Sequence, residues 1–222
     1  MSVVPLSRRK PPPPTVVCFV RHGTTATTGK LLPGRARGLH LSDQGRQEAT
    51  KVGEALSGMP VSAIYSSPLE RTRETASVIS RSVGKPVVAE RGLIECDFGS
   101  WTGEPLSQLS KLPEWWTVQH WPSGFRFPGG ESFVELQSRL VDTVGRICKA
   151  HPGEVVVAVS HADCIKVALA SILGVPLDLF QRIVVAPCSI STVVYGSDGP
   201  AVLAMGSTGV PAHLPSIPER SL

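Results

Sequence analysis

The chain has 222 residues, 41% of them hydrophobic and 18% charged, a balance typical of one soluble globular domain of ordinary size. No apolar run approaches the roughly 20 residues of a membrane-spanning helix, which excludes a helical membrane protein. Of 22 basic residues, Arg8, Arg9 and Lys10 lie at the N-terminus, so 19 remain against 18 acidic residues, without the basic stripe that nucleic acid requires.

The cysteines are widely spaced and form neither a CxxC pair nor a Cys/His pattern typical of zinc sites. They are Cys18, Cys96, Cys148, Cys164 and Cys188. An odd number of scattered cysteines favours reduced, mostly buried thiols, and we therefore expect a cytoplasmic protein.

The first half of the chain alternates strand and helix patterns. Residues 1–14 read MSVVPLSRRKPPPP and lack the apolar stretch of a signal peptide, so we expect a proline-rich N-terminal arm in polyproline II conformation. A β-branched strand is predicted over Thr15–Val20, and residues 21–41 form a long loop of the kind that is usually functional. A helix over Ser42–Leu56 and a strand over Val61–Tyr65 follow.

The stretch Ser67–Glu70 predicts the start of a second helix, with a serine cap, proline at the first helical position and glutamate placed for a capping box. Apolar residues spaced by three and four continue this helix to Val83. A short strand is expected over Pro86–Ala89. Residues 90–130 are rich in Trp, Pro and Gly, and we expect them to contain one short helix near Glu104–Leu109.

The second half repeats the alternation. Helical spacing over Glu131–Ala150 precedes EVVVAVS, an apolar run typical of a parallel strand buried on both faces, which ends at Ser160. A helix over Asp163–Leu173 comes next. Three further strands are expected near Arg182–Val185, Ser191–Tyr195 and Ala201–Ala204.

This order predicts an α/β fold, a three-layer α/β/α sandwich around a mostly parallel central sheet. We expect one domain over residues 15–205, between the N-terminal arm and a C-terminal tail over residues 206–222. Ligand sites in such sheets gather at the carboxyl ends of the strands.

Two histidines, His22 and His161, stand just past the ends of the predicted buried strands. One histidine in such a place is more often structural, but two at equivalent positions favour a site. Arg21 adds a cation beside the first histidine, and Arg71 adds another in the first turns of a helix. Cations that converge in this way need an anion between them, and a phosphoryl group would suit. Taken alone, Arg71 reads as a surface residue paired with a glutamate of its own helix.

Six segments, in this order, resemble the successive motifs of the histidine phosphatase superfamily, which includes the cofactor-dependent phosphoglycerate mutases. The segments are Phe19–Gly23, Leu41–Gly45, Ser66–Ala76, Glu95–Gly103, Pro128–Ser132 and Val159–Ala162. The resemblance covers roughly residues 15 to 205. One RHG triplet is a weak signal, whereas six ordered motifs are a strong one.

The resemblance implies that His22 is the nucleophile that takes the phosphoryl group and that Glu95 protonates the leaving alkoxide. It also counts His161 as catalytic. The groups that it implies for phosphate binding are the side chains of Arg21, Arg71 and His161 and the backbone amide of Ala162. Cationic side chains can stabilise the transferred phosphoryl group without a metal, and the chain has no carboxylate cluster for magnesium, so we expect neither a metal nor a cofactor.

The sequence departs from the family in the loop after RHG. Many relatives have acidic or amide side chains where this chain has Thr24 and Thr28, and the usual Gln-Gly or Thr-Gly pair reads Pro33-Gly34. Thr28 and Gly34 are therefore candidate substrate-pocket residues of unusual type.

Three functions stay open. The segment ECDFGSWTG resembles the phosphatase branch, which favours hydrolysis of a small-molecule phosphate monoester. Together with the segment FQRIVVAPCSIS, it also resembles an actinobacterial group of phosphomutase-like proteins. A phosphoglycerate mutase-type phosphomutase is the alternative, and a non-catalytic phosphate-binding or interaction module is the third. The oligomeric state is open, with a dimer as one option.

Overall fold

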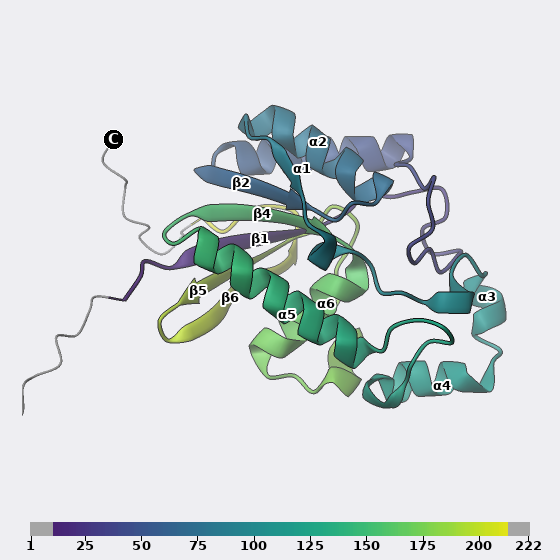
Figure 1. Ribbon diagram of the computed structural model, residues 1–222. Helices are drawn as coiled ribbons and strands as arrows, with labels where there is room; N and C mark the ends of the chain where they lie inside the picture. Colours follow the sequence, from purple (N-terminus) through teal and green to yellow (C-terminus); the bar gives the residue numbers. More distant parts are fainter. Residues whose placement is uncertain (1–10, 213–222) are drawn as a thin grey trace, which may run out of the picture.

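The computed structural model describes residues 11–212 and contains a six-stranded sheet in the order β3-β2-β4-β1-β5-β6 (Figure 1). The four strands β3, β2, β4 and β1 are mutually parallel, and β5 is antiparallel to β1 and to β6. The strands are β1 (Thr15–Arg21), β2 (Val61–Ser66), β3 (Val87–Ala89), β4 (Val155–Ser160), β5 (Ile190–Gly196) and β6 (Gly199–Ser207).

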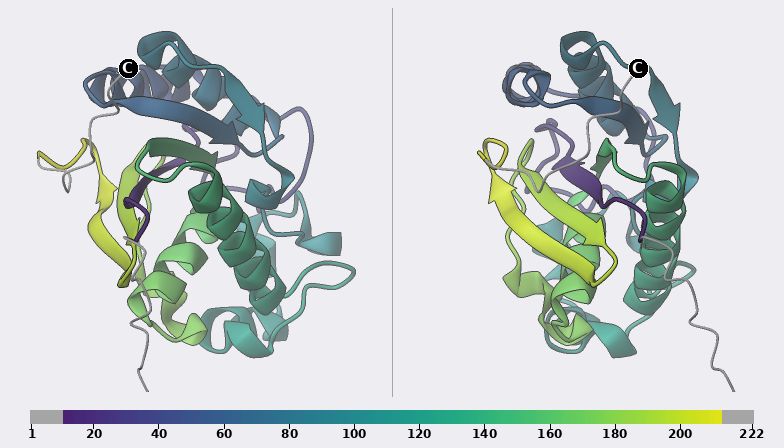
Figure 2. Two further views of the ribbon diagram at one scale, coloured as in Figure 1. Left: turned by 60° about the vertical axis from the view of Figure 1, so that its left-hand side comes forward. Right: turned by 90° about the vertical axis from the view of Figure 1, so that its left-hand side faces the viewer.

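Helices cover both faces of this sheet. In the views of Figures 1 and 2, α1 and α2 lie on one side, and α5 and α6 lie on the other. The helices are α1 (Asp43–Ser57), α2 (Glu70–Val83), α3 (Leu106–Leu109), α4 (Pro113–His120), α5 (Phe133–Ala150) and α6 (Ala162–Leu173). The predicted three-layer α/β/α sandwich is confirmed. Within residues 11–212, no helix combines the length and the apolar character needed to cross a bilayer.

The central strand β1 explains why the sheet needs both helical layers. Its side chains alternate between two apolar clusters, Val16, Cys18 and Val20 facing one and Val17 and Phe19 facing the other. Each cluster is completed by one pair of helices, because successive residues of a strand point to opposite faces. The sheet interior is therefore mostly apolar on both sides, and the one charged residue of the described strands, Arg21, lies at a strand end.

The secondary structure predicted from the sequence differs from the structure at the start of α2, at α4, near Arg182–Val185 and at the end of β6. Helix α2 begins at Glu70 with Leu69 as its cap residue, so the predicted capping box at Ser67 does not form. Helix α4 was not predicted, and the expected strand near Arg182–Val185 is absent, because a 3₁₀ helix occupies Leu177–Arg182 and no strand follows it before β5. Strand β6 continues to Ser207, past the expected end of the domain.

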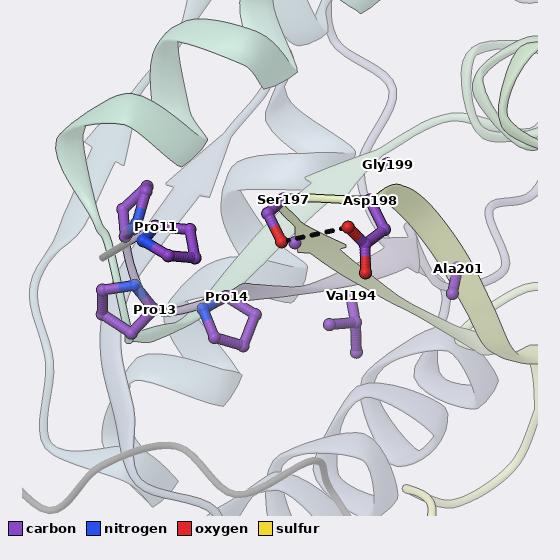
Figure 3. A pocket seen from close by; sticks show the side chains of 10 residues that line it. Pro11, Pro13, Pro14, Val194, Ser197, Asp198, Gly199 and Ala201 are labelled. Atoms are coloured by element: carbon purple, nitrogen blue, oxygen red, sulfur yellow. Dashed lines mark hydrogen bonds between the residues drawn. The ribbon is translucent and has the colours of Figure 1, made fainter. Parts of the chain in front are cut away.

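The described part of the proline arm lies beside the turn between β5 and β6. Pro11 to Pro14 line a cavity of about 670 Å³ together with Val194, Ala201 and the turn residues 196–199 (Figure 3). The carbonyl oxygen of Pro13 accepts a hydrogen bond from the backbone N–H of Gly153 at 3.1 Å. The other parts of the predicted arm and tail, residues 1–10 and 213–222, lie outside the described residues.

The loop after β1 packs closely against the start of α1. A methyl group added at Gly45 would lie 2.1 Å from the Thr24 carbonyl oxygen, so the two backbones approach as only glycine allows. The Ser42 side chain fixes the same contact, because its Oγ donates to Thr24 O at 3.0 Å and accepts from Gly45 N at 3.1 Å. The backbone beside His22 is thus held by the N-terminus of a helix.

Gly45→Ala is expected to lower the midpoint of thermal unfolding by several degrees and to reduce activity, because the loop that carries His22 must shift. Gly145→Ala in α5 is the matched control. An added methyl group there meets nothing within 4 Å, so that variant should be as stable as the parent or more stable. Equal melting temperatures for the two variants would contradict the proposed close packing.

Candidate active site

The carboxyl ends of β1 and β4 bring the two predicted histidines together. The strands are parallel neighbours, with Arg21 paired with Ser160, and the backbone N–H of His22 donates to Ser160 O at 3.0 Å. His22 and His161 therefore leave the sheet side by side, with ring centroids 5.3 Å apart. The prediction that both strand ends form one site is consistent with this geometry.

The tautomer of His22 follows from its contacts. Its Nδ1 lies 2.8 Å from the carbonyl oxygen of Gly23, which can only accept, so Nδ1 carries the proton and Nε2 keeps a lone pair. Burial and the nearby positive charge of Arg71 lower the pKa of His22 to about 3. The ring is therefore neutral at pH 7, which is the state of a nucleophilic imidazole.

Arg71 is fully buried, with an exposed fraction of 0%. Its Nε donates to His22 Nε2 at 3.3 Å, and its Nη2 lies 2.8 Å from Gly34 O and 3.2 Å from His161 Nδ1. Nη1 has no hydrogen-bond partner within residues 11–212. Because an unpaired guanidinium is costly to bury, this arrangement favours an anion at the site.

The reading of Arg71 as a surface residue paired on its own helix is wrong. Glu74 contacts other groups, accepting from Leu41 N at 3.0 Å and from Arg46 Nη1 at 3.3 Å and lying against His40. Arg71 points instead from the first turn of α2 toward the strand ends. A helix arginine that contacts two histidines has the placement of a site residue.

Arg21 supplies a second guanidinium. Its Nη1 donates to Val185 O at 2.7 Å, which orients the group, while its buried Nε has no partner among the described residues. Two guanidinium groups with spare donors thus stand near His22. Such donors match the oxygens of a phosphate or carboxylate.

Ser67 contacts a predicted site residue, although the sequence did not indicate it as a candidate. Its Oγ lies 2.8 Å from His161 Nε2, on the far side of the ring from Arg71. Since Arg71 donates to Nδ1, the Nε2 atom carries the proton and donates to Ser67. Burial and the charge of Arg71 hold the pKa of His161 well below its usual range. The serine was interpreted as a helix cap, and its pattern of neighbours gave no other signal.

Glu95 is 5% exposed and lies near both histidine-bearing strands. Its Oε1 accepts from Cys96 N at 3.0 Å and lies 3.5 Å from the Cys164 sulfur, and its Oε2 is 3.8 Å from His161 Nδ1. Burial, with a smaller contribution from the negative charge of Asp163, raises its pKa to about 7. A carboxyl group with that pKa can both give and take a proton near neutral pH.

A network of ion pairs fixes the backbone around Glu95. Arg35 Nε donates to Glu95 O at 2.9 Å, and Arg139 Nη1 donates to Gly92 O and Ile94 O at 2.7 and 2.9 Å. Both arginines also bind the carboxylate of Glu131 at 2.9 Å. The loop that carries Glu95 is therefore braced from two sides.

A cavity of about 240 Å³ opens at these strand ends. The predicted site residues that line it are Arg21, His22, Thr28, Glu95 and Ala162, and its other lining residues are Thr25, Gly29, Leu31, Leu32, Pro33, Phe98, Leu106 and Asp163. Arg71 and His161 do not line it and contact His22 from the protein interior. Gly34 is also outside the lining and binds Arg71 through its carbonyl oxygen.

Ala162 is the first residue of α6. The first N–H groups of a helix have no partner within the helix and face its positive end, so the backbone of Ala162 can donate to an anion in the cavity. Thr28 closes a turn, since its Oγ1 accepts from Thr25 N at 2.9 Å. Within residues 11–212, no three His, Cys, Asp or Glu side chains are grouped as a metal site would need.

Solved structures of the same fold include phosphatases. The mycobacterial glucosyl-3-phosphoglycerate phosphatase has a TM-score of 0.79 at 22% identity, over 87% of this chain and 99% of that one, a likeness of fold alone. A phosphoserine phosphatase from Entamoeba histolytica, solved with phosphoserine, has a TM-score of 0.79 at 26% identity, over 87% and 98% of the two chains.

Sequence comparison gives the family. Residues 17–208 match the model of the histidine phosphatase superfamily (branch 1). The chain is 32% identical to the probable phosphoglycerate mutase GpmB of Klebsiella pneumoniae over 182 residues, 81% of this chain and 84% of that protein. It is 34% identical to phosphoserine phosphatase 1 of Hydrogenobacter thermophilus over 154 residues, 66% and 72% of the two chains. Site geometry, fold and sequence agree, and the chain belongs to the histidine phosphatase superfamily.

Proposed function

We propose that the protein is a phosphatase that hydrolyses a small-molecule phosphate monoester through a phosphohistidine intermediate on His22. The observation that carries this proposal is the pairing of a neutral, oriented imidazole with two guanidinium groups whose buried N–H donors lack partners among residues 11–212. A transferred phosphoryl group needs a nucleophile on one side and positive charge around its oxygens.

In the first step, the lone pair of His22 Nε2 attacks phosphorus and the ester P–O bond breaks. The phosphoryl oxygens replace His22 as the partner of Arg71 and bind the free donors of Arg21. Glu95, protonated below a pKa of about 7, gives its proton to the leaving alkoxide. The alcohol then departs through the mouth of the cavity.

In the second step, water attacks the phosphohistidine and the P–N bond breaks. The Glu95 carboxylate takes one proton from the water, and the electron pair returns to His22 Nε2. Inorganic phosphate leaves, and both side chains regain their first protonation states. Gly23 keeps the ring in one tautomer throughout, because its carbonyl oxygen holds the Nδ1 proton at 2.8 Å.

The proposal needs no metal and no cofactor, since the charge of the phosphoryl group is balanced by Arg21 and Arg71. The proposed partner is the phosphate monoester itself, and we propose that the protein acts in the cytoplasm without binding nucleic acid or membrane. Thr28 belongs to the wall of the proposed substrate pocket. Gly34 does not line the pocket and contributes through its carbonyl oxygen, which accepts a hydrogen bond from Arg71.

Phosphoglycerate mutase activity is the second candidate, favoured by the relative of that name at 32% identity. A mutase must hold a substrate carboxylate as well as a phosphate, in two orientations. Among the described lining residues Arg21 is the one cation. Lys111 and Arg126, the lysine and the arginine of residues 104–130, do not line the cavity. Arg126 instead binds the carboxylate of Glu135. This lining favours the phosphatase.

The test follows phosphate release from p-nitrophenyl phosphate and, separately, the fate of 3-phosphoglycerate with a catalytic amount of 2,3-bisphosphoglycerate. We expect phosphate release that outpaces the formation of 2-phosphoglycerate and that persists after extensive dialysis against EDTA. Isomerisation faster than hydrolysis would make the protein a mutase. Loss of activity on chelation, restored by magnesium or zinc, would refute the metal-free mechanism.

A further inference from the structure

Asp163 is a charged lining residue to which the proposed mechanism gives no direct contact with the substrate, although its charge helps to raise the pKa of Glu95. It lies in the first turn of α6, directly after Ala162, and lines the same cavity as Arg21, His22 and Glu95. An acidic residue at a helix N-terminus is ordinarily explained by the helix dipole. Asp163 also lines the cavity that the proposed substrate would occupy, so its charge can act on that substrate.

On the cavity side, the lining cation that interacts with Asp163 is Arg21, and a bound phosphate would engage the charge of that guanidinium group. A bound phosphate dianion would be balanced by the two guanidinium groups, while His22 and His161 are neutral and Glu95 is protonated. Lys166 lies 3.7 Å from the Asp163 carboxylate, but it does not line the cavity, and its Nζ also donates to Gln181 at 3.3 Å. One negative charge therefore remains at the cavity wall.

The rest of the described mouth is apolar or carries hydroxyl groups. Its side chains are Leu31, Leu32, Pro33, Phe98 and Leu106, with Thr25 and Thr28. The nearby Arg35 cannot serve a substrate carboxylate, because it is already bound to Asp97 and Glu131 at 3.1 and 2.9 Å. The cavity walls can therefore bury the apolar part of a substrate alcohol, and Asp163 can pair with a positively charged group on it.

We infer that Asp163 is a specificity-determining residue that selects phosphate esters of neutral or cationic alcohols and excludes esters whose alcohol carries a carboxylate. This inference rests on the proposed phosphatase function and deepens it. A carboxylate within the small cavity would face the like charge of Asp163, and among the described lining residues the one cation, Arg21, would already be bound to the phosphate. An ammonium group would gain the same charge as a partner.

The experiment uses three esters of matched length: propyl phosphate, 3-aminopropyl phosphate and 3-(phosphonooxy)propanoate. For the intact protein, we expect kcat/KM for the carboxylate ester to be at least about tenfold below that for propyl phosphate. Asp163→Asn should raise the ratio of carboxylate to neutral ester by about threefold to tenfold and lower the ratio of amino to neutral ester. Asp163→Ser is a second variant, with a short polar residue that suits a helix start.

Ratios separate specificity from other effects of the substitution. Removing Asp163 also changes the pKa of Glu95, but the three alkoxides have similar basicity, so that change acts alike on all of them. Asp198→Asn is the matched control, since Asp198 is exposed in the turn between β5 and β6. That turn lies beside the start of β1, at the other end of the strand from His22.

The outcomes are distinct. Equal kcat/KM values for the three esters, a preference for the carboxylate ester, or ratios that Asp163→Asn leaves unchanged would overturn the inference while the phosphatase proposal stands. Failure of the intact protein to hydrolyse any of the esters or p-nitrophenyl phosphate would overturn the proposed function, and the inference with it.

Discussion

His22→Ala protein is expected to form no phosphoenzyme and to hydrolyse phosphate esters at least about 10³-fold more slowly than the parent. The intact protein, quenched in alkali during turnover of a ³²P-labelled ester, should carry label that is stable to base and lost in acid, as a phosphorus–nitrogen bond requires. The reason lies in access. His22 lines the cavity, and its Nε2 accepts a 3.3 Å hydrogen bond from Arg71 that a phosphoryl oxygen can take over. His161 is 0% exposed, and its two ring nitrogens are held by Arg71 and Ser67.

Peptide mapping of the labelled protein identifies the histidine directly. His22→Asn serves as a second variant, since it keeps a side-chain donor for the Gly23 carbonyl, and melting temperatures confirm that each variant is folded. His120→Ala, at an exposed histidine of α4, is the control and should label normally. Stoichiometric label in folded His22→Ala protein, or label that maps to His161, would refute the assignment.

Glu95→Gln is expected to slow hydrolysis of alkyl phosphates by about 10²- to 10⁴-fold while slowing p-nitrophenyl phosphate by less than about tenfold. An alkoxide is a poor leaving group and needs a proton as the P–O bond breaks, whereas nitrophenolate leaves without one. The side chain is placed for this task, since it lines the cavity beside His22 and its pKa is raised by burial to about 7. The measurement is kcat/KM for both esters in both proteins.

The pH profile tests the same assignment independently. Glu95 is protonated below about pH 7 in the folded protein, so kcat/KM for an alkyl phosphate should fall as the pH rises through 7. The Gln variant cannot lose that proton, and its residual rate should show no such decline. Glu114→Gln, at an exposed carboxyl group of α4, should keep the parental profile. Equal losses on both esters, or an unchanged profile in Glu95→Gln, would make Glu95 structural.

The layered fold could be predicted because its signals are local. β1 is apolar from Val16 to Val20 and β4 from Val155 to Val159, and α5 keeps one apolar face, so element type and order follow from nearby residues. The errors lie where distant parts of the chain decide. The segment after Phe180 has strand-like composition, yet Arg21 takes the Val185 carbonyl that a strand neighbour would need.

The charged residues of the candidate site could be proposed from the sequence, but the residues that hold them in place could not. His22, Arg71 and Glu95 stand in recognisable segments, but Ser67 had a plausible local reading as a helix cap. The brace of Arg35 and Arg139 on Glu131 joins residues up to 96 positions apart. No periodicity or turn pattern encodes such a contact, so only the folded chain reveals it.

The buried guanidinium of Arg71 also bears on the conformational stability of the whole protein. A charge held away from water, with Nη1 unpaired among residues 11–212, is expected to make the empty protein less stable than the same fold with a well-packed neutral side chain there. Anything that binds this group in the folded chain alone shifts the folding equilibrium by mass action. The substrate and the product phosphate of the proposed reaction are then expected to act as stabilising ligands of the folded protein.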